Sequence, residues 1–217
     1  MVASIDGRID CHMVDHISGD EYYTALDSLN CPASLEGRVT MQKYYAEPGY
    51  YNSFDSTEMD CETFFRATPR SDFFICPDTH GSLKWRSGVL DDGRPLLVIA
   101  SEEATEEYLD YLRDKGISYI VTGKGKIDLA LAMRILRDEF GVERMAVLGG
   151  GLINGGFLDA GLIDEVSLLL APGIDGRAGW RVLFDGIADQ QKLPTRLKLQ
   201  SVERFENDVV WLRYLVV

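Results

Sequence analysis

The chain has 217 residues, of which 46% are hydrophobic and 26% are charged, with a formal net charge of −13 at pH 7. This much apolar material is enough for the core of one fairly large domain. Because Lys and Arg do not cluster and the balance is acidic, nucleic acid and anionic membranes are excluded as main partners, and an anionic ligand has to be held by local features.

The location expected from the sequence is the cytoplasm. No stretch approaches the roughly 20 apolar residues of a membrane span. The first residues, MVASIDGRID, lack the basic, apolar and cleavage regions of a secretory signal.

The cysteines and histidines do not form a metal-binding pattern. His12 and His16 would share one face of a helix, but the segment runs into Ser18-Gly19-Asp20, which predicts a loop and no metal site. Free thiols are favoured over disulfides or zinc, because no CxxC pair occurs among the four cysteines, Cys11, Cys31, Cys61 and Cys76.

From about Arg94 onward, short apolar runs alternate with segments of helical spacing. The pattern predicts strands at 95–101, 117–123 and 144–150, and helices at 102–116, 127–141 and 152–161. Such alternation indicates βαβ units, a parallel core sheet and right-handed connections.

The C-terminal part indicates antiparallel strands. A strand is predicted at 163–172 and a two-stranded hairpin at 195–217, separated by a Gly-rich loop at 173–191. The hairpin has more apolar residues than one sheet face can cover, and we expect a homodimer through it. These residues are Val209, Trp211, Leu212, Tyr214, Leu215 and Val217.

The first 93 residues are less regular. We expect helices at 21–29 and 40–49 and strands at 34–40 and 72–81. The segment 50–72 is interpreted as an extended insertion whose aromatic residues either cap a pocket or belong to the core or an interface: Tyr50, Tyr51, Phe54, Phe64 and Phe65. Because no repeat or linker divides the chain, we predict a single three-layer α/β domain over residues 1–217. Its central sheet is mixed and mostly parallel, with an antiparallel C-terminal hairpin.

Three consecutive glycines, 149–151, end a predicted strand and open a helix at Leu152. Bare backbone lets a ligand phosphate come close, and the helix N-terminus offers N–H donors with a partial positive charge. The alternative is a tight turn. The triplet is not a GxGxxG fingerprint, and Asp175 lies in a loop where that fingerprint needs an acid in a second strand, so a doubly wound dinucleotide-binding fold is the weaker hypothesis.

A second anion-binding helix start is predicted at Gly37-Arg38, where Thr40 would cap a helix that begins at Met41. Two such starts suit a cofactor that contains pyrophosphate. The alternative is that Arg38 is a solvated surface residue and Thr40 only a cap.

Four motifs carry a family resemblance. They are ASIDGRI at 3–9, LEGRVT at 35–40, ICPDT at 75–79 and VLGGGLINGGFLDAGLIDEVSLLLAP at 147–172. In order and spacing they resemble the reductase domain of riboflavin biosynthesis, a member of the dihydrofolate-reductase-like superfamily. The resemblance implies that fold, NADPH as cofactor, and hydride transfer to a small heterocycle, in this family a ribosylaminopyrimidine phosphate.

The resemblance also implies the cofactor-binding residues and a cis peptide between Gly149 and Gly150. The residues are Ala3 beneath the nicotinamide; Gly37, Arg38 and Thr40 at the phosphates; Asp78 and Thr79 near the adenosine ribose; Ser101, matched only by position, toward the 2′-phosphate; and Gly149, Gly150, Gly151, Leu152, Ile153 and Asn154 at the pyrophosphate.

The substrate half of the site is less defined. Asp6 resembles the family's acidic residue on the substrate side and is the candidate catalytic residue, although it also suits a simple Asp-Gly turn. Glu21 and Asp27 are further candidate acids, and the proton donor stays unassigned. Leu148 stands where the family typically has Glu. This difference leaves open two alternatives: a reductase of another pterin, imine or carbonyl, or a nucleotide-binding domain without activity.

The predicted first strand begins almost at Met1, whereas relatives have several further residues before it. Either the start is trimmed or misassigned, or this strand is short.

Overall fold

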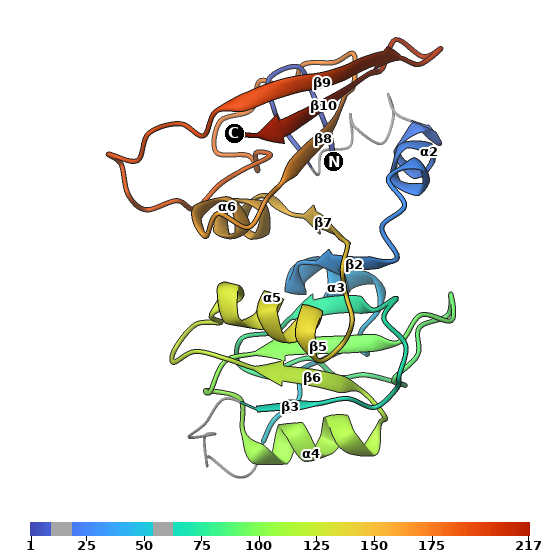
Figure 1. Ribbon diagram of the computed structural model, residues 1–217, viewed down its shortest axis with the longest axis vertical. Helices are drawn as coiled ribbons and strands as arrows, with labels where there is room; N and C mark the ends of the chain where they lie inside the picture. Colours follow the sequence, from blue (N-terminus) through green and yellow to red (C-terminus); the bar gives the residue numbers. More distant parts are fainter. Residues whose placement is uncertain (10–18, 54–62) are drawn as a thin grey trace. The chain divides into compact units, whose positions relative to one another are not determined.

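The computed structural model describes residues 1–9, 19–53 and 63–217, which fall into two compact units (Figure 1). Unit 1 contains Met1–Cys31 and Gly149–Val217, and unit 2 contains Pro32–Leu148. The single-domain assignment stays a prediction. Six residues named above lie outside the described residues: Cys11, His12, His16, Ser18, Phe54 and Cys61.

The sheet of unit 2 is mixed and mostly parallel, as predicted. Among the described residues its strand order is β3-β6-β5-β4-β2-β7. Neighbours from β2 to β6 pair in parallel, while β3 is antiparallel to β6. The strands are β2 (Ala33–Glu36), β3 (Thr63–Phe65), β4 (Phe74–Pro77), β5 (Leu96–Ala100), β6 (Ser118–Val121) and β7 (Met145–Gly149).

Helices α3 (Arg38–Tyr44), α4 (Glu106–Asp114) and α5 (Leu129–Asp138) pack on this sheet. Met41 of α3 and Leu109 and Leu112 of α4 share one apolar cluster with alternate residues of β4, β5 and β6. Figure 1 shows α4 and α5 on opposite sides of these strands, which gives unit 2 three layers. Side-chain caps fix both helix starts, since Thr105 accepts a hydrogen bond from the N–H of Tyr108 and Asp128 from that of Leu131.

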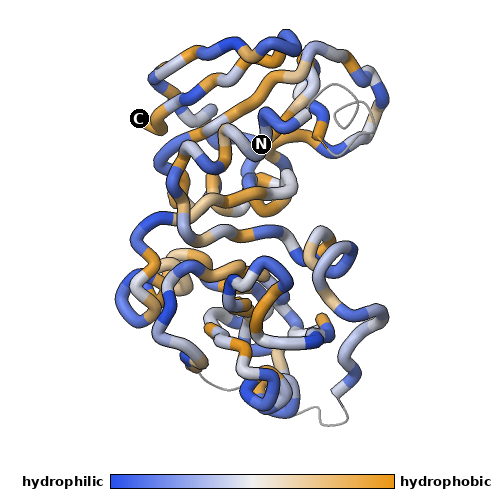
Figure 2. The backbone as a smooth tube through the Cα atoms, turned by 90° about the vertical axis from the view of Figure 1, so that its right-hand side faces the viewer, coloured by the Kyte–Doolittle hydropathy of each residue, from blue (hydrophilic) through white to orange (hydrophobic). Residues whose placement is uncertain are grey.

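Unit 1 has a second sheet, with the order β1-β8-β10-β9 among the described residues. Here β1 (Val2–Ala3) is parallel to β8 (Glu165–Leu170), and β10 (Val210–Val216) is antiparallel to both β8 and β9 (Leu197–Arg204). The predicted hairpin is therefore present, and hydrophobic and hydrophilic residues alternate along it (Figure 2). The fold class is confirmed, with one change: the hairpin joins this second sheet and not the larger one.

The described residues of unit 1 also form helices α2 (Glu21–Ser28) and α6 (Gly151–Asp159). Ala25 of α2 packs in a small apolar cluster with Leu169, Val209 and Trp211 of the sheet. None of the helices in the described part of the chain has the length and apolar content of a membrane span.

Candidate functional site

The carboxyl ends of the parallel strands of unit 2 meet at one edge of the sheet, called here the carboxyl edge. It comprises the residues that follow β2, β4, β5 and β6: 36–40, 78–80, 101–103 and 122–128. Crevices at such edges are the usual ligand sites of α/β sheets. Of the predicted cofactor-binding residues, Gly37, Arg38, Thr40, Asp78, Thr79 and Ser101 all lie on this edge.

The start of α3 corrects one prediction. The helix begins at Arg38, and its N-cap is Gly37, with φ −65° and ψ 149°. The Gly37 carbonyl accepts the first helical hydrogen bond, from the N–H of Met41 at 3.1 Å. Thr40 therefore lies inside the first turn and does not cap the helix. Arg38 donates to the side-chain oxygen of Gln42 at 3.3 Å.

The Asp78 carboxylate is fully buried and is occupied by its own loop. It accepts hydrogen bonds from the backbone N–H and hydroxyl of Ser82 at 2.7 and 2.9 Å, and from the N–H of Leu83 at 2.8 Å. The hydroxyl of Tyr108 lies 3.3 Å from the same carboxylate. Asp78 thus shapes the loop, and Thr79 is the partly exposed residue of the predicted pair.

Ser101 joins the end of β5 to the β4 loop. Its buried hydroxyl donates to the carbonyl of Thr79 at 2.9 Å and accepts from the N–H of Glu103 at 3.2 Å. Because this hydroxyl is directed into the protein, the predicted contact with a 2′-phosphate does not fit the geometry.

In unit 1, the glycine triplet forms the entrance to α6. The peptide between Gly149 and Gly150 is cis, as the resemblance implied. Gly150 is the N-cap and accepts from the N–H of Asn154 at 3.0 Å. The first N–H groups of a helix have no partner within it, so Gly151, Leu152 and Ile153 present main-chain donors suited to a phosphate. Leu152 itself is 62% exposed.

The three positions of the triplet differ in why glycine is favoured there. Gly149 has a φ of +90°, which favours glycine. A Cβ on Gly151 would lie 2.2 Å from the carbonyl oxygen of Val182, so this glycine is required by packing. Around Gly150 the nearest described atom is Cδ1 of Ile9, at an ordinary 3.8 Å. The predicted cradle for a phosphate is therefore reduced to Gly150 and the first turn of α6.

Asn154 is buried and donates to the carbonyl of Leu183 at 2.8 Å. Its side chain thus binds the backbone of segment 182–185, which is part of the Gly-rich loop predicted at 173–191. Ala3 is buried in β1, where it pairs with Leu170.

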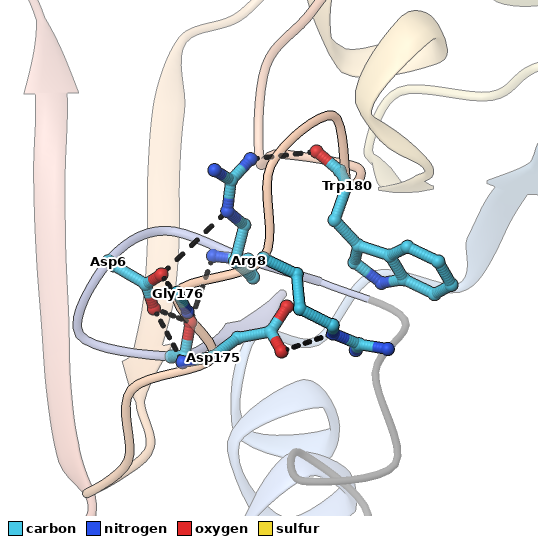
Figure 3. Close-up of polar contacts among 7 residues, drawn as sticks. Asp6, Arg8, Asp175, Gly176 and Trp180 are labelled. Carbon is cyan, nitrogen blue, oxygen red and sulfur yellow. Dashed lines mark hydrogen bonds and ion pairs between the residues drawn. The ribbon is translucent and has the colours of Figure 1, made fainter.

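Asp6 lies in a turn and accepts several hydrogen bonds (Figure 3). Its partners are the hydroxyl of Ser4 at 2.6 Å and the backbone N–H groups of Asp175 and Gly176 at 3.1 and 2.9 Å. The Ser4 hydroxyl, with the two amides, holds the pKa of Asp6 well below its usual range. Asp6 is therefore an ionised acceptor, and a proton-donating role does not fit this geometry. Its assignment as a catalytic residue stays a prediction.

Two arginines complete this cluster (Figure 3). Arg8 lies 3.7 Å from the Asp6 carboxylate and donates to the carbonyl of Trp180 at 2.8 Å. Arg177 pairs with Asp175 at 2.5 Å and lies 4.1 Å above the Trp180 ring. The contacts between the turn at Asp6 and the loop at 175–180 were not predicted from the sequence. A signal that could have indicated them is the tripeptide Asp-Gly-Arg, which occurs at both 6–8 and 175–177.

The other candidate acids do not resemble proton donors. Glu21 accepts from the N–H of Gly19 at 2.6 Å and from the side chain of Asn207 at 2.5 Å. Its own backbone N–H, together with these two donors, lowers its pKa.

Asp27 is exposed on α2, and Leu148 is half-buried in β7. Within the described ranges, no three His, Cys, Asp or Glu side chains gather as metal ligands.

These features define a mixed α/β protein with main-chain N–H donors at a helix start and a polar carboxyl edge. The model of the RibD C-terminal domain family matches residues 1–211, and the chain belongs to this family. The resemblance stated from the sequence is thereby confirmed.

A curated relative is the 2,5-diamino-6-ribosylamino-4(3H)-pyrimidinone 5′-phosphate reductase of Methanothermobacter thermautotrophicus. It is 34% identical over 123 residues, which are 56% of this chain and 56% of that protein. The match therefore spans little more than half the length of either.

Solved structures share the fold over the whole chain. A pyrimidine reductase-like protein from Corynebacterium diphtheriae has a TM-score of 0.73 at 20% identity, covering 100% of this chain and 89% of its own. RibD of Acinetobacter baumannii has a TM-score of 0.70 at 18% identity, covering 100% and 56%. The riboflavin biosynthesis reductase Rib7 of Saccharomyces cerevisiae has a TM-score of 0.55 at 17% identity, covering 100% and 85%.

Proposed function

We propose that the chain is a reductase that binds a nicotinamide dinucleotide, for which the family resemblance implies NADPH, and transfers a hydride to a small heterocycle. The substrate class is a ribosylaminopyrimidine phosphate, the compound in the name of the Methanothermobacter relative. The observation that carries the proposal is the start of α6, where a Cβ at Gly150 would meet only Ile9 among the described residues, at 3.8 Å, beside main-chain donors.

The donor set fits such a cofactor. In a chain with a net charge of −13, a phosphate needs donors that are independent of overall charge, and helix N–H groups supply them. Within unit 2, the Gly37 turn and Thr79 on the carboxyl edge also have groups that suit phosphate and ribose. When bound, the cofactor supplies the hydride; the chain binds and orients it.

The proton donor is not assigned to Asp6 or Glu21, because both carboxylates are ionised acceptors in internal hydrogen bonds. Leu148 has no hydrogen-bonding group for a sugar or pyrimidine. A reductase of another pterin, imine or carbonyl is therefore the second candidate.

Thermal unfolding with and without dinucleotide tests the proposal. A ligand that binds only the folded state stabilises it, by about 2.7 kcal/mol when the ligand concentration is 100 times Kd. The melting temperature therefore rises. Gly150→Val should abolish this shift, because its branched side chain fills the space left for the phosphate. No shift with the unmodified protein at millimolar NADPH and NADH would leave a domain without this activity.

Two further proposals concern assembly and location. Of the residues on which the predicted homodimer rested, Val209 and Trp211 are buried in the apolar cluster of unit 1. The proposal is supported instead by the exposed apolar residues of the hairpin, Leu197, Leu199, Val202, Leu215 and Val217. The cytoplasm is the proposed compartment, as expected for an enzyme that would draw on a soluble nicotinamide pool.

A further inference from the structure

Two contacts between a basic side chain and a carboxylate lie on the carboxyl edge, one on each side of the end of β5. Nδ1 of His80, after β4, is 2.6 Å from the Glu103 carboxylate. Nζ of Lys124, after β6, is 3.8 Å from the Glu102 carboxylate. Both glutamates directly follow Ser101, the residue matched by position to the 2′-phosphate contact.

The glutamates are held in place by the backbone. The N–H of Glu102 donates to the carbonyl of Gly123 at 2.9 Å, and the N–H of Glu103 donates to the hydroxyl of Ser101 at 3.2 Å. The Glu102 side chain is only 11% exposed, whereas its partner Lys124 is 79% exposed. Within this pair the Glu102 carboxylate is therefore the buried member and the Lys124 ammonium the exposed one.

The carboxyl edge carries no surplus of positive charge. Its cationic side chains are Arg38, Lys124 and Lys126. Its carboxylates are Glu36, Glu102, Glu103 and Asp128, in addition to the buried Asp78. Carboxylates thus outnumber cations on this edge even before a ligand arrives.

The 2′ substituent of the adenosine ribose is the only difference between NADPH and NADH. A 2′-phosphate needs arginine or lysine to offset its charge, whereas a 2′-hydroxyl is recognised by a carboxylate that accepts its hydrogen bond. On this edge two carboxylates stand next to Ser101, Glu102 facing Lys124 and Glu103 facing His80, and the Ser101 hydroxyl is directed inward. The charge distribution therefore suits the hydroxyl.

We propose that Glu102 and Glu103 determine the ribose selectivity of the dinucleotide site, so that the chain binds NADH at least as tightly as NADPH. The inference rests on the proposed function, because it requires the dinucleotide to lie with its adenosine end on this edge. It assigns a specificity role to two residues outside the four family motifs.

Direct binding measurements test the selectivity without need of a substrate. NADH and NADPH are titrated into the purified chain, and Kd is followed by calorimetry or by energy transfer from tryptophan to the reduced nicotinamide. We expect a Kd for NADH equal to or below that for NADPH. Glu103→Gln keeps a hydrogen-bond acceptor for His80 but removes one charge, so NADPH should bind about fourfold more tightly, as for one charge at roughly 5 Å in water. NADH should change by less than about twofold.

The control is Glu143→Gln, which makes the same charge change at an exposed residue after α5, away from the carboxyl edge. It should leave both constants unchanged. A second measurement needs no variant: NADPH affinity should not fall as salt rises, because no net attraction is screened.

The outcomes separate the two proposals. A preference for NADPH of tenfold or more in the unmodified chain, or an equal effect of Glu103→Gln on both dinucleotides, overturns the selectivity inference and leaves the reductase standing. Absence of binding by either dinucleotide removes the reductase proposal and the inference together.

Discussion

The carbonyl oxygen of Asp185 lies 1.8 Å from the position that a Cβ on Gly155 would occupy. The backbone N–H of Asp185 also donates a hydrogen bond to the carbonyl of Gly151, at 3.0 Å. Two of the glycines in α6 are thus set by backbone that packs directly on the helix.

Glycine substitutions in and before α6 should separate packing from ligand binding. Gly155→Ala introduces a methyl group where Asp185 backbone lies, and we expect a loss of about 3 kcal/mol of unfolding free energy in urea. Gly150→Ala meets no described atom closer than 3.8 Å and should cost less than about 1 kcal/mol. Equal losses at both sites would contradict the packing argument.

Asp6→Asn should weaken the hydrogen bonds that the Asp6 side chain accepts from the backbone N–H groups of Asp175 and Gly176. We expect a lower melting temperature above about pH 5, because an amide accepts weaker hydrogen bonds than the ionised carboxylate. The folded pKa of Asp6 is depressed, so its contribution is present above the unfolded value near 3.9 and is lost as pH falls below it.

The melting temperatures of Asp6→Asn and the unmodified chain should therefore converge in acid. A variant that keeps its melting temperature but loses the alkaline limb of the kcat profile would instead make Asp6 a proton donor.

Asp78→Asn places an amide group where the carboxylate accepts from Ser82, Leu83 and Tyr108. A buried donor would then face other donors, and we expect a loss of about 2–3 kcal/mol in urea unfolding. Ser82→Ala removes a single side-chain bond to Asp78 and should cost about 1 kcal/mol. Dinucleotide affinity of the folded Asp78→Asn protein should change little, whereas a large loss of affinity with unchanged stability would make Asp78 a ligand contact.

The Cys76 thiol should be inert in the native protein. Complete burial raises its pKa well above the ordinary value, so the reactive thiolate is scarce at neutral pH. Labelling with a maleimide, mapped by mass spectrometry, should modify the half-buried Cys31 before Cys76, and Cys76 only as the chain unfolds in urea. Rapid native labelling of Cys76 would show that β4 opens without global unfolding.

The dimer proposal is tested at the edge strand β9. Leu199 and Val202 are 50% and 56% exposed, and lysine at both positions should convert a dimer to a monomer by light scattering at micromolar concentration. Lys198→Gln, on the same strand, is the control and should leave the dimer intact. A monomer for the unmodified chain would end this proposal.

Local signals predicted much of the fold. The apolar runs of β5 and β6 and the amphipathic, capped helices α4 and α5 agree with the prediction to within a few residues, because each signal lies inside its own segment. The β9–β10 hairpin was equally visible, through alternation around residues 206–208.

Long-range contacts were not predicted. Nothing near Gly151 or Gly155 in the sequence indicates that residues 182–185 lie against them. The glycine triplet was therefore interpreted as a phosphate site or a tight turn, and packing against distant backbone was not predicted. Asp78 and Asp6 were given ligand roles for a related reason: a polar residue at a strand end has the same sequence pattern whether its partners are a ligand or distant backbone. At α3, Thr40 is a better cap than Gly37 by residue type, but the helix begins three residues earlier than predicted.

Unit 1 is assembled from both ends of the chain, whereas unit 2 is a continuous stretch, Pro32–Leu148. During synthesis on the ribosome, β1 leaves the exit tunnel first, yet its partner β8 follows more than 160 residues later, as the pairing of Val2 with Leu169 requires. Unit 2 can therefore complete its sheet before β8, the pairing partner of β1, has been synthesised. Truncated nascent chains that end before β8 should protect unit 2 from proteolysis and leave the N-terminal segment open to cleavage.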